Sequence, residues 1–163
     1  MADVFVSYAR TDRSRAAPLV AAIEAQGWSV WWDPAIAAGQ EFDRRIAAEL
    51  AIAAAVLVVW TPSSVESRWV RGEAREAADR GILVPVRFDA ARLPIDVRAL
   101  HTIDLDQAGA DSPQRQELLQ ALRALVARAR GAAGDASIPA PPAATPAPMP
   151  RASHSAAGGP NNV

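Results

Sequence analysis

The sequence predicts an α/β fold in which a parallel sheet of five strands is covered by helices on both faces. Short runs of strand-forming residues alternate with segments of helical periodicity from the first residues onward, which is the pattern of repeated strand–helix units. The run from Ala54 to Val59 is apolar without interruption. Such a run is typical of a central parallel strand that is buried on both faces.

The first half of the chain contributes two strands and two helices to this prediction. The first strand, residues 4–6, is followed by apolar residues at helical spacing until Gly27 provides a stop. The tryptophan-rich second strand, residues 28–32, ends at the turn signal Asp33-Pro34. A loop of small residues then leads to a second helix between Phe42 and Ile52.

The second half continues the alternation after the central strand. Ser67 is predicted as the N-cap of a third helix that ends at Gly81. The fourth strand, residues 82–86, contains a proline, and a residue without an N–H group favours a position near the edge of a sheet. A short fifth strand is expected at residues 101–105, and Pro113 opens a long last helix.

Units repeated in this way predict a flavodoxin-like sheet with the strand order 2-1-3-4-5. In such sheets ligands bind beyond the carboxyl ends of the strands. Three segments follow strands and are therefore expected at that edge: Ser7 to Asp12, Asp33 to Gln40, and Thr61 to Glu73. We expect Ser7 and Asp12 to satisfy backbone groups at the turn into the first helix.

The chain divides into one domain and a tail. Residues 1–131 contain all of the periodic segments, which is an ordinary size for one domain. From about Gly131 onward alanine and proline dominate and no apolar period remains. We therefore predict that residues 132–163 form a disordered Ala/Pro-rich linker or tail, as expected of the N-terminal module of something longer.

The composition excludes several classes of function. A net charge of −1 gives no electrostatic reason to expect binding to nucleic acid or to an acidic membrane. Without cysteine the chain has no disulfide, thiolate metal site or cysteine nucleophile. The N-terminus lacks a secretion signal, and the longest apolar run, residues 51–60, is too short to cross a bilayer. We expect a cytoplasmic protein without a membrane or nucleic-acid partner.

Motifs of several common enzyme classes are missing as well. The chain has neither a phosphate loop with Gly-Lys nor a Gly-x-Gly-x-x-Gly turn after the first strand. His154 lies in the tail, and His101 begins a strand remote from the expected site, so a Ser-His-Asp hydrolase has no support and His101 is interpreted as structural. No His, Asp and Glu residues have the spacing of metal ligands, so no metal is expected.

The most informative carboxylate lies on the predicted third helix. Glu73 follows Trp69 by four residues, so the two side chains lie on the same face, one turn apart. The neighbouring charges have expected partners one turn away: Arg75 with Asp79, and Glu76 with Arg80. Glu73 has none, and an unpaired carboxylate beside an aromatic ring suits a site for a flat ring and a hydroxylated sugar. The alternatives are a solvated Glu73 and a Trp69 that packs between helix and sheet.

Three motifs occur in order, each at the expected strand. They are Asp3 to Ala9, Val30 to Asp33 with Ile36 and Gly39, and Ser67 to Val70 with Glu73. Together they resemble a bacterial Toll/interleukin-1 receptor (TIR) domain of the NAD+-cleaving type, over about residues 2 to 130. The resemblance implies a five-stranded flavodoxin-like fold. It also implies either NAD+ cleavage or a scaffold that acts through TIR–TIR contacts.

The resemblance also assigns residues to roles. In the cleaving members the catalytic residue is a glutamate in a Trp-x-x-x-Glu context, which Trp69 and Glu73 match. The loop after the second strand is the family's assembly loop and borders the nucleotide pocket. It corresponds here to Pro34, Ala35, Ile36, Ala37 and Ala38. The expected substrate-binding residues are Trp69, Arg10, Tyr8, Trp32, Asp33 and Gly39.

Which tryptophan stacks on the substrate stays open at this stage. Alternation along a strand sends Trp31 and Trp32 to opposite faces of the sheet, so both side chains cannot line one pocket. Arg10, just after the first strand, is a candidate for a phosphate contact, and a plain surface charge is the alternative.

Cleavage of the nicotinamide–ribose bond is one of the few reactions that need a carboxylate and no histidine. The pyridine ring is cationic in the substrate and leaves as a neutral molecule, so no acid has to protonate it. Positive charge then develops on the ribose, where one oriented carboxylate can stabilise it. The expected function is an NAD+ glycohydrolase or cyclase, an effector in bacterial defence or stress signalling that assembles into homo-oligomers. NAD+ is its substrate and no cofactor is expected.

Overall fold

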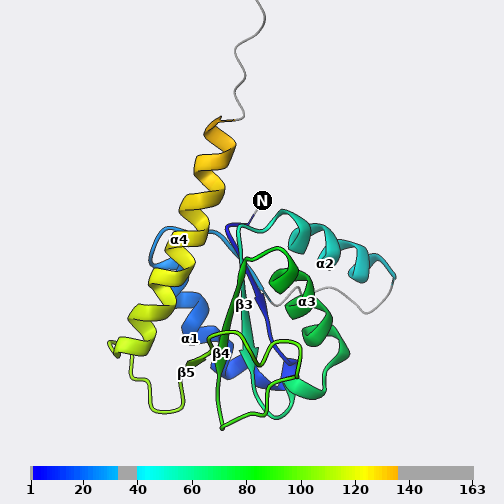
Figure 1. Ribbon diagram of the computed structural model, residues 1–163, viewed down its shortest axis with the longest axis vertical. Helices are drawn as coiled ribbons and strands as arrows, with labels where there is room; N and C mark the ends of the chain where they lie inside the picture. Colours follow the sequence, from blue (N-terminus) through cyan, green and yellow to red (C-terminus); the bar gives the residue numbers. More distant parts are fainter. Residues whose placement is uncertain (1, 33–39, 136–163) are drawn as a thin grey trace, which may run out of the picture.

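The structure is a computed structural model that describes residues 2–32 and 40–135. Five parallel strands form one sheet in the order β2-β1-β3-β4-β5, which confirms the predicted fold and strand order (Figure 1). The strands are β1 (Val4–Ser7), β2 (Val30–Trp31), β3 (Ala55–Trp60), β4 (Leu83–Arg87) and β5 (Ile103–Asp104). Because all five run in the same direction, their carboxyl ends lie at one edge.

Four α-helices cover the sheet, two on each face. They are α1 (Arg13–Glu24), α2 (Gln40–Ile52), α3 (Arg68–Asp79) and α4 (Pro113–Asp135), and two short 3-10 helices are η1 (Arg10–Asp12) and η2 (Ser64–Glu66). Buried residues of α1 and α4 form one core cluster with the sheet, and those of α2 and α3 form the other. Figure 1 shows α1 and α4 on one side of the strands and α2 and α3 on the other. None of these helices is both long and apolar enough to span a membrane.

The central strand explains why the sheet forms as predicted. All six residues of β3 are buried, because the strand has a neighbour on each side and helices on each face. Leu57 and Val59 belong to the cluster under α1 and α4, whereas Val58 and Trp60 belong to the opposite one. This alternation is the one expected of a strand.

Signals in the local sequence determine where several helices and strands begin or end. The Ser67 hydroxyl accepts a hydrogen bond from the N–H group of Val70 at 3.4 Å, so Ser67 is the N-cap of α3 as predicted. Gly27 follows α1 with a φ of 79°, a conformation that favours glycine. Pro85 lies in β4, next to the edge strand β5, and β5 pairs only with Val86 and Arg87.

The structure differs from the prediction in element length. β2 and β5 have two residues each, where five were expected in each case. The last helix α4 continues to Asp135, four residues beyond the predicted domain end at residue 131. Residues 136–163, the rest of the predicted tail, lie outside the described part of the chain.

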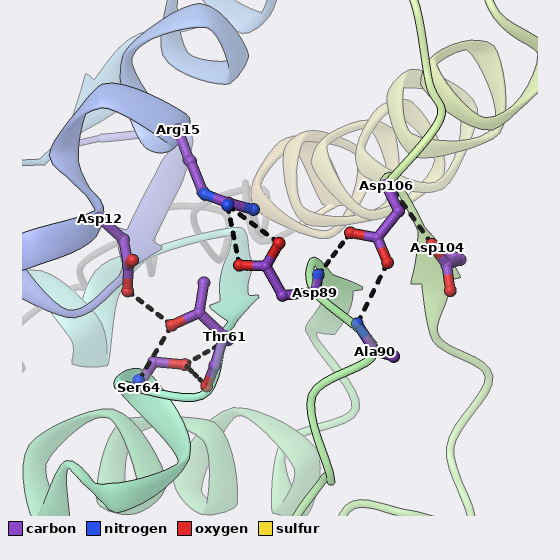
Figure 2. Close-up of polar contacts among 8 residues, drawn as sticks. All are labelled: Asp12, Arg15, Thr61, Ser64, Asp89, Ala90, Asp104 and Asp106. Atoms are coloured by element: carbon purple, nitrogen blue, oxygen red, sulfur yellow. Dashed lines mark hydrogen bonds and ion pairs between the residues drawn. The ribbon is translucent and has the colours of Figure 1, made fainter.

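A polar network ties the loops at the carboxyl edge together (Figure 2). The Thr61 hydroxyl, after β3, donates to the Asp12 carboxylate at 2.6 Å, and the Ser64 N–H group donates to Thr61 at 3.0 Å. Asp12 stands at the N-cap of α1 but makes no side-chain cap hydrogen bond. The prediction that Asp12 satisfies the helix start was therefore wrong, because the turn after β3 supplies a buried hydroxyl donor instead.

A second part of this network holds a left-handed turn after β4. Asp89 and Ala90 have φ angles of 54° and 46°, and the Asp106 carboxylate accepts hydrogen bonds from both of their N–H groups. Arg15 of α1 forms an ion pair with Asp89 at 2.7 Å. The strained turn thus connects α1, β4 and the segment after β5 (Figure 2).

Candidate active site

A pocket of about 530 Å³ opens at the carboxyl end of β1, within the size range of ligand pockets. Its wall is formed by β1 and the loop after it, by β2, by α2 and by the first turns of α3. The polar and aromatic residues that line it include Ser7, Tyr8, Arg10, Trp31, Trp69 and Glu73. The pocket therefore lies at the edge of the sheet where the sequence predicted a ligand site.

Glu73 projects from the buried face of α3. It lies three residues after Val70 and four before Ala77, and both of these residues are buried against the sheet. Its carboxylate Oε2 accepts a hydrogen bond of 2.5 Å from the hydroxyl of Ser7, the last residue of β1. Glu73 is half-buried, which corrects the alternative interpretation of a solvated helix residue.

The surroundings of Glu73 favour the protonated carboxyl group. Burial raises the pKa of Glu73 to about 7, and the nearby carboxylate of Glu76 adds to the rise. The hydrogen bond from Ser7 opposes it by stabilising the ionised form. A carboxyl group with a pKa near neutrality in a pocket wall is a feature of functional sites.

Trp69 lies at the mouth of the pocket. Its side chain is 56% exposed, so it does not pack as a plug between α3 and the sheet. It also lines a second cavity of about 540 Å³ between α2 and α3, which shares Glu73 with the first. An exposed aromatic ring one helical turn from a carboxylate is available to stack on a planar ligand.

The loop after β1 brings two predicted residues to the same pocket. Arg10 is exposed and Tyr8 is half-buried, and both line it. The structure therefore brings Tyr8, Arg10, Trp69 and Glu73 together around one cavity, and their roles in catalysis and substrate binding stay predictions.

The two tryptophans at the end of β2 face opposite sides of the sheet, as predicted. Trp31 stacks on Phe5 with ring centroids 4.8 Å apart and lines the pocket. Trp32 lies against Tyr8, at 6.0 Å, and under the guanidinium of Arg13. In the described part of the chain Trp32 is not among the residues that line the pocket, so the structure brings Trp31 there in its place.

The predicted substrate-binding residues Asp33 and Gly39 lie outside the described residues, as do the assembly-loop residues Pro34, Ala35, Ile36, Ala37 and Ala38. Their roles stay predictions.

Two expectations about the charges of α3 were wrong. Arg75 forms its ion pair with Asp96 at 2.6 Å, and Arg80 donates to the backbone carbonyls of Leu50 and Ala53. Tertiary packing offered both arginines partners outside the helix in place of Asp79 and Glu76.

Away from the pocket, His101 pairs with Glu117 at 2.5 Å on the surface, in keeping with the structural role expected of it. Among the described residues no group of three or more His, Asp or Glu side chains could hold a metal ion.

Sequence reasoning missed Ser7 as a site residue, and it assigned Trp32 to the substrate-binding set where Trp31 lines the pocket. Ser7 was expected to bond backbone groups, but its hydroxyl donates to Glu73. The signal for this contact was available in part: Ser7 lies two residues after Phe5 in the same strand, so both face the helices α2 and α3.

Comparison with known proteins identifies the family. The model of the TIR domain family matches residues 4–121, most of the described chain. The chain belongs to the TIR domain family. No curated protein sequence matches it.

Solved structures agree on the fold of this TIR domain. A metazoan TIR-STING receptor from C. gigas, solved with 2′,3′-cGAMP, aligns with a TM-score of 0.61 and 22% identity over 75% of this chain. The TIR domain of the Toll-related receptor TRR-2 from Hydra magnipapillata aligns with a TM-score of 0.61 and 17% identity over 80% of this chain and 99% of that domain. The chain spans 39% of the TIR-STING receptor. At these identities the likeness concerns the fold alone.

Proposed function

We propose that this TIR domain cleaves NAD+ between nicotinamide and ribose, with Glu73 as the catalytic carboxylate. The observation that carries the proposal is the place of Glu73, half-buried in the wall of a 530 Å³ pocket at the ligand-binding edge of the sheet. Trp69 at the mouth, in the Trp-x-x-x-Glu context of the cleaving TIR domains, supports the same role.

The chemistry requires little besides this carboxylate. Nicotinamide leaves as a neutral base, while positive charge develops on the ribose in an oxocarbenium-like transition state. A carboxylate that is already oriented and partly shielded from water stabilises that charge more strongly than an exposed one would. Glu73 also offers hydrogen-bond acceptors to the ribose hydroxyl groups. Water then yields linear ADP-ribose, or an atom of the substrate closes a cyclic product.

Glu73 has to be ionised for this role, although its burial raises its pKa to about 7. The cationic pyridine ring of bound NAD+ brings a positive charge close to the carboxyl group, and so favours its ionised form. Substrate binding and ionisation of Glu73 therefore support each other.

Other pocket residues match the remaining parts of the substrate. Arg10 is exposed at the rim and carries a cation suited to the diphosphate. Trp69 and Trp31 present aromatic surfaces for a ring, and Tyr8, in the loop after β1, adds a hydroxyl-bearing ring to the pocket wall. NAD+ is the substrate in this proposal and no further cofactor takes part.

We further propose that activity depends on self-assembly of TIR domains, as in an effector of bacterial defence or stress signalling in the cytoplasm. The exposed Trp69 leaves the pocket open on the side of α2 and α3, where a neighbouring copy can complete it.

The test is nicotinamide release from NAD+ by the full chain held at high local concentration on beads. Glu73→Ala is expected to abolish release. Glu66→Gln, which removes an exposed glutamate just before α3, is expected to keep it. Release by the Glu73→Ala variant at the wild-type rate would overturn the catalytic assignment.

A scaffold that recruits other TIR domains is the second candidate. The exposure of Trp69 favours it, because a large apolar side chain at 56% exposure is a common feature of protein interfaces. Association of the immobilised chain with a second copy, without nicotinamide release by the wild type, would favour the scaffold over the enzyme.

A further inference from the structure

The hydroxyl group of Ser7 lies at a buried position in an otherwise apolar strand. It is the last residue of β1, lies opposite Val58 of β3, and is only 2% exposed. The other residues of β1 are apolar. A buried polar side chain costs free energy unless it has a hydrogen-bond partner, and the partner of Ser7 is Glu73, 66 residues further along the chain.

The geometry of this contact is that of a charge-assisted hydrogen bond. The distance between Ser7 Oγ and Glu73 Oε2 is 2.5 Å, within the range for a hydroxyl that donates to a carboxylate. A serine has one O–H proton, and here it is directed at one oxygen of Glu73. A carboxylate has a second oxygen, which is a further acceptor for a ligand in the pocket.

We infer that Ser7 is a positioning residue, which holds the Glu73 carboxylate in one orientation and favours its ionised form. The inference deepens the proposed function, because it names what prepares Glu73 for the reaction. Ser7 sits at the end of the sheet, so it is fixed by the strand pairing of β1 with β3. Glu73 is fixed in turn by the helix α3. The hydrogen bond therefore joins two rigid elements across the pocket wall.

Other groups around Glu73 do not replace this donor. The apolar or aromatic side chains of Ile46 from α2 and Trp31 from β2 face the pocket. The charged and titratable side chains around the two cavities are Tyr8, Arg10, Arg68 and Glu76. Arg10 and Arg68 are exposed, and Glu76 opposes ionisation of Glu73. In the described part of the chain, the hydroxyl of Ser7 is the side-chain donor whose hydrogen bond stabilises the ionised form of Glu73.

Loss of the hydroxyl therefore has a predictable effect. In Ser7→Ala the carboxylate keeps its burial but loses its donor, so its protonated form is favoured further. We expect the pKa of Glu73 to rise by about one unit above the wild-type value. Ser7→Thr keeps a hydroxyl at the same position and is expected to keep the wild-type pKa.

The pKa can be measured directly in the free protein by carboxyl-carbon NMR of the ¹³C-glutamate-labelled full chain. Glu73→Gln identifies the signal. Thr61→Val is the matched control, because it removes another buried hydroxyl at this edge that donates to a carboxylate, that of Asp12. It is expected to leave the pKa of Glu73 unchanged. A Glu73 pKa in Ser7→Ala equal to the wild-type value would overturn the inference.

Turnover supplies a second and separate readout. If Ser7 positions Glu73, the acid limb of the kcat profile in Ser7→Ala moves to higher pH with little change in KM, and Ser7→Thr restores it. Identical pH profiles in wild type and Ser7→Ala would contradict the role. A wild type that releases no nicotinamide would reject the proposed function, while the NMR titration would still decide the role of Ser7.

Discussion

At the scale of single residues, the ionisation of Glu73 couples the site to the stability of the fold. The unfolded chain has a glutamate pKa near 4.5, and burial raises the folded value to about 7. Between these two values the folded state binds more protons than the unfolded state, so the free energy of unfolding falls as pH rises from about 4.5 to about 7. The shift corresponds to about 3 kcal/mol once Glu73 is fully ionised.

This coupling predicts the behaviour of Glu73→Gln, which has no charge to bury. Relative to wild type the variant is expected to gain stability as pH rises, with a small difference at pH 5 and a gain of up to about 3 kcal/mol at pH 8. Urea denaturation at both pH values measures the difference. A difference that is the same at pH 5 and pH 8 would show that Glu73 does not titrate in the expected window.

The contacts of single side chains were predicted from the sequence less completely than the helices and strands were. Trp69 and Glu73 were recognisable because they are four residues apart on one helix. Their surroundings were not, because Ser7 and Glu73 meet across 66 residues and only the folded sheet brings them together. Burial of Glu73 was likewise unexpected, although its spacing from Val70 and Ala77 puts it on the buried face of α3.

At the scale of elements, the left-handed turn after β4 stores local strain. Ala90 has a φ of 46°, a conformation in which its Cβ atom crowds the backbone. Asp106 holds the turn through the N–H groups of Asp89 and Ala90, and Arg15 ties Asp89 to α1. The strain is thus offset by contacts from two neighbouring elements.

Ala90→Gly is therefore expected to stabilise the protein by about 1 kcal/mol, since glycine adopts a positive φ without strain. Ala25→Gly is the control, because Ala25 is exposed with an ordinary φ of −61°, and glycine there is expected to lower the stability. Thermal unfolding of both variants compares the two. A loss of stability in Ala90→Gly as large as in Ala25→Gly would contradict the strain at this turn.

Elements with a strong local signal were predicted well. The apolar run of β3, the Ser67 cap and the Gly27 stop each depend on a few neighbouring residues, and each was confirmed. β2 and β5 were predicted too long, because pairing with a neighbour decides where a strand ends. The partners of Arg75 and Arg80 were also missed, because those partners lie on other elements of the fold.

At the scale of the whole molecule, two arginines of α4 attach this last described helix to the start of the sheet. Arg128 donates to the backbone carbonyl of Gly81 at 3.0 Å, and Arg130 pairs with Asp3 at 2.9 Å. These contacts attach the last turns of α4 to the amino ends of β4 and β1. The following residues, 136–163, are rich in alanine and proline without an apolar period.

Removal of residues 136–163 is expected to leave the melting temperature unchanged, because their composition provides no face to bury in a core. Truncation after Val126 removes the contacts of Arg128 and Arg130 and is expected to cost about 1 kcal/mol. Calorimetry of both truncated chains tests this boundary. A clear drop in melting temperature after removal of residues 136–163 alone would place part of the tail in the domain.

In the proposed reaction, ionised Glu73 of this TIR domain promotes cleavage of NAD+. The most direct test of this role is the rate of nicotinamide release by the immobilised full chain as a function of pH, beside Glu73→Gln. We expect kcat/KM of the wild type to rise with pH through about 7, as Glu73 loses its proton, and we expect the variant to release nothing at any pH. Nicotinamide release by Glu73→Gln with the wild-type pH profile would contradict this role.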